Sequence, residues 1–168
     1  DPFVPPPPGA SAVVLDLRGS TGGYLAAIND LLVPFLAGGP TYGIETDGQV
    51  DMATARRRAS VELPLFVLVD EETSAGAEAV ARALQVRERG TVVGQATRGG
   101  FDLVAHVYEY PDHGGALKLA VGRLVAPDGS SLAHGVQPDV LTDARGEVLE
   151  AALASGEFPE PGSGPGVS

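Results

Sequence analysis

Short runs of apolar residues, each leading into a turn, constrain the fold of this chain more than any other feature. They cover Ala12–Leu17, Leu65–Val69 and Thr91–Gly94. A short, nearly continuous apolar run is typical of a strand buried on both faces, as in a parallel sheet. The first two runs are followed by apolar residues at helical spacing, namely Leu25, Ile28, Leu32 and Phe35, then Ala77, Val80, Ala81 and Leu84. This alternation predicts an α/β fold with a mostly parallel twisted sheet flanked by helices.

The second half of the chain predicts a different element. Phe101–Tyr110 and Ala116–Val125 read as two strands joined through a turn rich in glycine, which predicts a β-hairpin region at 101–125. Glu147–Ala154 carries apolar residues on one side and predicts a final helix.

The ends of the chain differ in composition from its middle. Residues 1–10 include four consecutive prolines and predict an extended, Pro-rich linker. Residues 156–168 are rich in Pro, Gly and Ser and predict a disordered tail. Residues 11–155 would then form one folded core, a length that suits a single domain.

Charge and composition exclude several classes of function. The net charge is −11, from 22 acidic and 11 basic residues, which argues against nucleic acid as a partner. No apolar run reaches the length of a membrane span. The chain has no cysteine, so it forms no disulfide and has no thiol chemistry. Glu45, Asp47 and Asp51 could suggest a metal site, but their scatter favours a solvated loop, and we expect neither metal nor cofactor.

A glycine-rich turn follows the first predicted strand. Leu15–Gly19 is followed closely by Gly22 and Gly23. Glycines at a strand-to-helix turn allow backbone N–H groups to point into a cleft. In an acyl-transfer enzyme such groups form part of an oxyanion hole. The alternative is a plain tight turn before a helix.

The second predicted strand leads into a helix through a turn of small residues. Val67–Asp70 is followed by Thr73–Gln85. The N-terminus of a helix stabilises negative charge, so a nucleophile placed there has its oxyanion stabilised. The alternative is that Thr73 or Ser74 simply caps the helix.

Taken together and in order, these segments resemble the tail-specific, or C-terminal processing, serine protease family of S41 type. The similar segments include Leu15–Gly23, Val67–Gln85, Thr91–Gly100, Ala116–Leu119, Ala126–Ser131 and Gly135–Asp139. The resemblance implies a ClpP/crotonase-like core, serine endopeptidase activity and unfolded polypeptides or peptide C-termini as substrates. It also suggests an extracytoplasmic location, secreted or periplasmic. It implies oxyanion or backbone contacts from Gly19, Gly22, Gly23 and Gly76.

The chain departs from this family where its catalytic residues are expected. An ungapped register places the nucleophile on Ala75 and the general-base lysine on Gly100. Three explanations stay open: Ala75 replaces a natural serine, the protein is a natural pseudoprotease that binds peptides, or Ser74 is an alternative nucleophile one residue away. The last fits least, because one residue along a helix rotates a side chain by about 100°.

The general base needs a separate assignment, because position 100 is a glycine. A branch of the family that resembles tricorn protease cores lacks this lysine and uses a histidine from a segment before the core. Within this chain His134 is the best candidate, because it lies where the resemblance brings the chain back toward the cleft. The sequence therefore predicts either a serine endopeptidase core that is inactive as written or a peptide-binding module.

Overall fold

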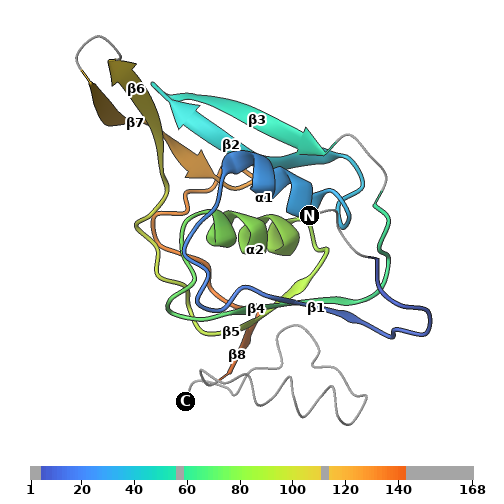
Figure 1. Ribbon diagram of the computed structural model, residues 1–168. Coiled ribbons are helices and arrows are strands. Elements are labelled where there is room, and N and C mark those ends of the chain that lie inside the picture. The colour runs from blue at the N-terminus through green and yellow to red at the C-terminus, as the bar shows by residue number, and fades with distance from the viewer. Residues whose placement is uncertain (1–4, 56–58, 111–113, 143–168) are drawn as a thin grey trace.

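The computed structural model describes residues 5–55, 59–110 and 114–142, and in these it has two sheets and two helices (Figure 1). In chain order the elements are β1 (Val13–Asp16), α1 (Leu25–Leu32), β2 (Gly39–Thr46), β3 (Gln49–Ala55), β4 (Leu65–Val69), α2 (Gly76–Val86), β5 (Thr91–Gly94), β6 (Leu103–Tyr110), β7 (Gly115–Val125) and β8 (Val140–Leu141). The α/β prediction is confirmed, but the strands divide equally between a parallel and an antiparallel sheet.

The parallel sheet is built from the apolar runs that the sequence displays. Its strand order is β1-β4-β5-β8, and every neighbouring pair is parallel. All five residues of the central strand β4 are buried, which explains why its sequence is apolar without alternation. Since parallel strands share a direction, the segments that follow β1 and β4 leave the sheet at the same edge. This arrangement brings the two candidate motifs together.

Both helices lie between the two sheets (Figure 1). Their apolar faces meet residues from both sheets in one core, whose fully buried members include Leu32, Leu36, Val67, Leu84 and Val92. Helix α2 is rich in alanine, and Ala79, Ala81 and Ala83 are fully buried. Small side chains on several faces of one helix suit a position between two layers, because neighbours can approach closely.

The antiparallel sheet contains a hairpin that the sequence analysis missed. Strands β2 and β3 pair over Gly39–Ala55, where Glu45, Asp47 and Asp51 were expected in a solvated loop. That expectation was wrong: Glu45 lies in β2, Asp51 in β3, and Asp47 at the turn. Asp47 and Gly48 have φ of 51° and 77°, as a two-residue hairpin turn requires. The described residues contain no group of acidic or histidine side chains able to hold a metal.

The predicted hairpin at 101–125 is confirmed and projects from the rest of the molecule (Figure 1). Strand β6 is the edge of the antiparallel sheet, whose order is β3-β2-β7-β6. From Ala105 to Tyr110 every residue of β6 is exposed. The hairpin therefore contributes little to the core, and only the β2-paired end of β7 is buried.

Several predictions concern residues outside the described part. The helix at Glu147–Ala154 and the tail at 156–168 lie there, and the domain limits stay predictions. Residues 5–10, in the predicted linker, form no helix or strand. No described helix is long and apolar enough to cross a membrane.

Candidate functional site

The turn between β4 and α2 holds Ala75 in an unusual backbone conformation. Ala75 immediately precedes α2 and has φ 55° and ψ −121°. A positive φ is uncommon for any residue with a side chain, and such a conformation costs on the order of 1–3 kcal/mol. Strain of this kind persists only where surrounding contacts impose it, and it concentrates at functional sites. The structure thus singles out the position that the ungapped register assigned to the nucleophile.

Glu78 is the residue that holds this turn from inside. Its carboxylate is fully buried and accepts the Ala75 N–H at 2.9 Å and the Gly99 N–H at 2.7 Å. The Thr97 hydroxyl donates to the same carboxylate. A buried carboxylate is stable only with such donors. Glu78 therefore fixes residue 75 relative to the loop at 97–99.

Asp70 ties the same turn to the glycine-rich turn after β1. Its carboxylate accepts the Gly19 N–H at 3.0 Å and the N–H and hydroxyl of Thr73, each at 2.9 Å. Burial alone would raise the pKa of Asp70, but hydrogen bonds from Gly19, Thr73 and Glu72 outweigh it and hold the pKa below its usual value. A further bond joins Ser74 N–H to the Ser20 carbonyl at 2.9 Å. The two turns are locked together.

The remaining glycines of the predicted set lie against residue 75. A Cβ added to Gly22 would come 3.8 Å from the Ala75 Cβ, and one added to Gly76 would come 3.4 Å from the Gly23 nitrogen. Among the described residues, the N–H groups of Gly22, Gly23 and Gly76 find no acceptor. They remain the candidate oxyanion donors that the family resemblance implied. The Gly19 N–H is already bonded to Asp70, so its contribution is to position the turn.

Position 100, where the resembling family keeps its lysine, lies in a loop fixed on both sides. Arg98 N–H donates to the Thr73 carbonyl at 3.0 Å, and Gly100 N–H to the Ala133 carbonyl at 2.9 Å. Gly100 has φ +75°, and a Cβ added there would meet nothing within 4 Å. Its backbone therefore has the conformation that favours glycine, with open space beside it.

The other candidate residues are less well placed. Ser74 is 2% exposed, so its hydroxyl does not face a solvent-filled cleft. The backbone of His134 lies against Gly99, while its side chain is exposed and makes no hydrogen bond to the described residues. Lys118, the only lysine, is exposed on the projecting hairpin. In the described part of the chain, no hydrogen bond joins any of these three side chains to residue 75.

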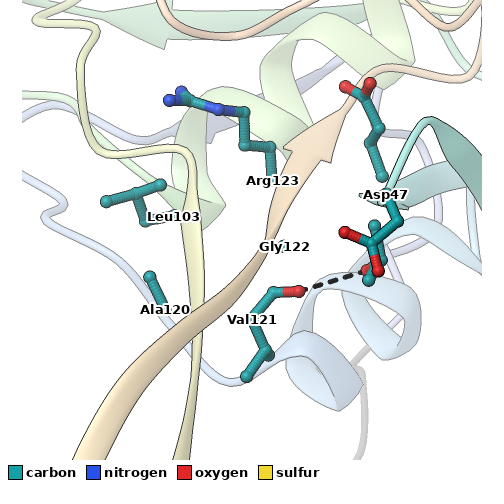
Figure 2. A pocket seen from close by; sticks show the side chains of 8 residues that line it. Asp47, Leu103, Ala120, Val121, Gly122 and Arg123 are labelled. Atoms are coloured by element: carbon teal, nitrogen blue, oxygen red, sulfur yellow. Dashed lines mark hydrogen bonds between the residues drawn. The ribbon is translucent and has the colours of Figure 1, made fainter.

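An open hollow of about 410 Å³ lies elsewhere, at the root of the projecting hairpin (Figure 2). The Thr46 hydroxyl donates to the Val121 carbonyl across it, at 3.3 Å. The guanidinium of Arg123 extends away from Asp47 (Figure 2) and pairs with the buried Asp102 at 3.1 Å. No residue that lines this hollow belongs to the turns around Ala75.

The central role of Glu78 in this candidate site was not predicted from the sequence. A signal was present, because a glutamate three residues after the residue that precedes a helix is the second half of a capping box. Its bond to the Ala75 N–H has that form. The bonds to Thr97 and Gly99 could not be read locally, since they join residues about twenty positions apart.

A strained residue between a buried strand and a helix, with unpaired N–H groups beside it, is similar in geometry to the strand-to-helix turn that carries the nucleophile in some hydrolases. The sequence profile of peptidase family S41 matches residues 7–142, and the chain belongs to this family. It is 32% identical over 149 residues to a carboxyl-terminal-processing protease of Synechocystis, covering 88% of this chain and 33% of that protein. It is 30% identical over 135 residues to carboxy-terminal processing protease CtpA of Bacillus subtilis, covering 79% and 28%.

Solved structures of other proteins have a similar fold. The photosystem II D1 C-terminal processing protease matches with a TM-score of 0.73 and 29% identity, over 81% of this chain and 36% of that one. A lipoprotein of Streptococcus agalactiae shares the fold, with a TM-score of 0.69 and 18% identity over 86% and 55%. The chain thus spans about a third of the length of the curated relatives it matches.

Proposed function

We propose that this chain is the peptidase-type core of a C-terminal processing protein that binds extended polypeptide and, as written, does not cleave it. The observation that carries the proposal is the conformation of Ala75 beside the unpaired N–H groups of Gly22, Gly23 and Gly76. Ala75 has no hydroxyl, so no acyl-enzyme can form there. Gly100 supplies no base. The relatives that are named as processing proteases support polypeptide as the ligand.

A single cysteine at position 75 tests this proposal. Because the chain has no cysteine, Ala75→Cys carries one thiol at the proposed site. A peptidyl chloromethyl ketone would alkylate it: the thiolate sulfur bonds to the methylene carbon and chloride leaves. For each cysteine variant, the rate of alkylation by the chloromethyl ketone is divided by the rate of alkylation by iodoacetamide. We expect this ratio to be at least about 10-fold higher for Ala75→Cys than for Ala116→Cys, a control on the exposed hairpin. Equal ratios at the two positions would contradict a peptide cleft at residue 75.

A second candidate is a serine peptidase whose serine is replaced at position 75 and whose base lies outside this chain. The strained backbone of Ala75 favours this second candidate, because strain of this kind concentrates at functional sites and indicates a position that once carried a catalytic residue. A hydroxyl without an adjacent base is a weak nucleophile. Ala75→Ser in this chain should therefore be acylated slowly by p-nitrophenyl acetate, and faster in a longer chain that carries the preceding segment of the protein.

The comparison needs four proteins, short and long, each with Ala or Ser at position 75. Equal rates for the two serine proteins would remove the external base and favour His134. No acylation of either serine protein would leave only the peptide-binding function.

A further inference from the structure

Arg98 lies immediately beside the turn that holds Ala75. Its N–H donates to the Thr73 carbonyl at 3.0 Å, and the two residue steps from Thr73 to Ala75 span at most about 7 Å. A peptide held over residue 75 would therefore pass close to Arg98.

The backbone that carries Arg98 is fixed on both flanks. Thr97 N–H donates to the Val136 carbonyl at 3.1 Å, and Gly99 N–H donates to buried Glu78 at 2.7 Å. A Cβ added to Gly99 would come 2.7 Å from the Gly135 nitrogen, so this segment packs tightly against the loop behind it. The side chain of Arg98 thus extends from a rigid support, which reduces the entropy lost on binding.

The charge of Arg98 has no carboxylate partner within the described part of the protein. Its side chain is exposed, and its guanidinium lies 5.9 Å from the centre of the Phe101 ring, which is 54% exposed. Each of the other described arginines contacts a carboxylate or backbone carbonyls: Arg18, Arg82, Arg87, Arg89 and Arg123. No carboxylate of the described residues lies within ion-pair distance of Arg98.

We propose that Arg98, which lies over the exposed ring of Phe101, selects polypeptides that carry a carboxylate within about two residues of the one held over Ala75. This rests on the proposed peptide-binding function. A guanidinium accommodates a carboxylate through two parallel hydrogen bonds, while the exposed ring offers apolar contact to the carbons beside it. The carboxylate is an aspartate or glutamate side chain or a free C-terminus. In a chain of net charge −11, a local cation gives specificity more than affinity.

The test uses four rhodamine-labelled octapeptides of the same Ala, Leu and Gly sequence. One is amidated and neutral, one is amidated with a single Glu, one has Gln at that place, and one is neutral with a free C-terminus. Fluorescence anisotropy measures their Kd with the unmodified chain, with Arg98→Gln and with Arg82→Gln, which removes the same charge from α2, where it pairs with Asp128. We expect at least one carboxylate peptide to bind about 5-fold more tightly than its neutral partner, except with Arg98→Gln.

The peptide that gains affinity shows whether the carboxylate comes from an acidic side chain or from a free C-terminus. Equal affinity for all four peptides would overturn the role of Arg98 and leave the peptide-binding function intact. A carboxylate preference that survives in Arg98→Gln would overturn it too. No binding of any peptide would overturn both the proposed function and this inference.

Discussion

The turn at Ala75 and the loop at Gly100 each have a small residue where the resembling family keeps a catalytic one, but their backbones differ. Ala75 has a positive φ that costs free energy for alanine. Gly100 has a positive φ that costs glycine nothing. The turn thus has a conformation that is strained for the residue it contains. The loop has a conformation matched to the residue it contains.

This difference bears on how the two positions arose. A single Ser-to-Ala exchange would leave the turn as it is observed, because its hydrogen bonds come from the backbone and from Glu78. A lysine at position 100 would occupy a left-handed conformation, at a cost of about 1–2 kcal/mol. We infer that the conformation of the loop itself disfavours a lysine at position 100. An exchange of serine for alanine at position 75, recent or natural, would in contrast fit the observed turn.

The largest effect on stability is expected from Glu78, which contacts both the turn at Ala75 and the loop that contains Gly100. Glu78→Ala leaves the N–H groups of Ala75 and Gly99 and the hydroxyl of Thr97 without their acceptor. Unpaired buried donors cost about 1–3 kcal/mol each before relaxation, and we expect a loss of about 3 kcal/mol in the free energy of unfolding, measured with urea. The control Glu72→Ala removes an exposed carboxylate and should change stability by less than about 0.5 kcal/mol. Similar losses for both variants would show that Glu78 does not join the regions.

Gly100→Ala tests whether the loop is built for glycine. The added methyl group meets open space, so only the backbone conformation opposes it. We expect a loss of about 1–2 kcal/mol in the free energy of unfolding. The matched control is Gly23→Ala, whose Cβ also meets nothing and whose φ is not positive. If the two variants are equally stable, the argument from the conformation of Gly100 fails.

Ala75→Gly is the converse experiment on the turn. Glycine releases strain of about 1–3 kcal/mol and adds an entropic cost of about 0.5–1 kcal/mol in the unfolded chain. A net gain of about 1 kcal/mol is expected, from thermal or urea unfolding. A loss of stability would mean that Ala75 is not strained, and the distinction between the two regions would disappear.

The sequence predicted the parallel sheet well because strands buried on both faces have few polar residues, as β4 illustrates. It failed for β2 and β3, since most of β3 is exposed and its mixture of polar and apolar residues forms no continuous apolar run. The Asp47-Gly48 pair was the local signal that could have identified this hairpin.

The candidate site could be predicted only in part, because a sequence pattern gives local positions and not contacts between distant residues. The order of the motifs pointed to positions 75 and 100, and Glu78 accepts the N–H of Ala75 and the N–H of Gly99, the residue before Gly100. The conformation of Ala75 could not be predicted, because it depends on hydrogen bonds that Glu78 and Ser74 form with Gly99 and Ser20, which are distant in sequence. The same holds for the Gly19 N–H, whose bond to Asp70 crosses 51 positions.

The smallest effect on stability is expected from Asp70, which holds the other side of the turn at residue 75. Because its folded-state pKa is lowered, Asp70 contributes stability that is present above its usual pKa of 3.8 and is lost as the pH falls through the folded value. Asp70→Asn removes this charge while keeping one acceptor oxygen. We expect it to cost about 1 kcal/mol near neutral pH and progressively less below about pH 4. Urea unfolding at a series of pH values, beside Asp30→Asn as an exposed control, measures the difference. A cost independent of pH would show that the charge of Asp70 is not what joins the two turns.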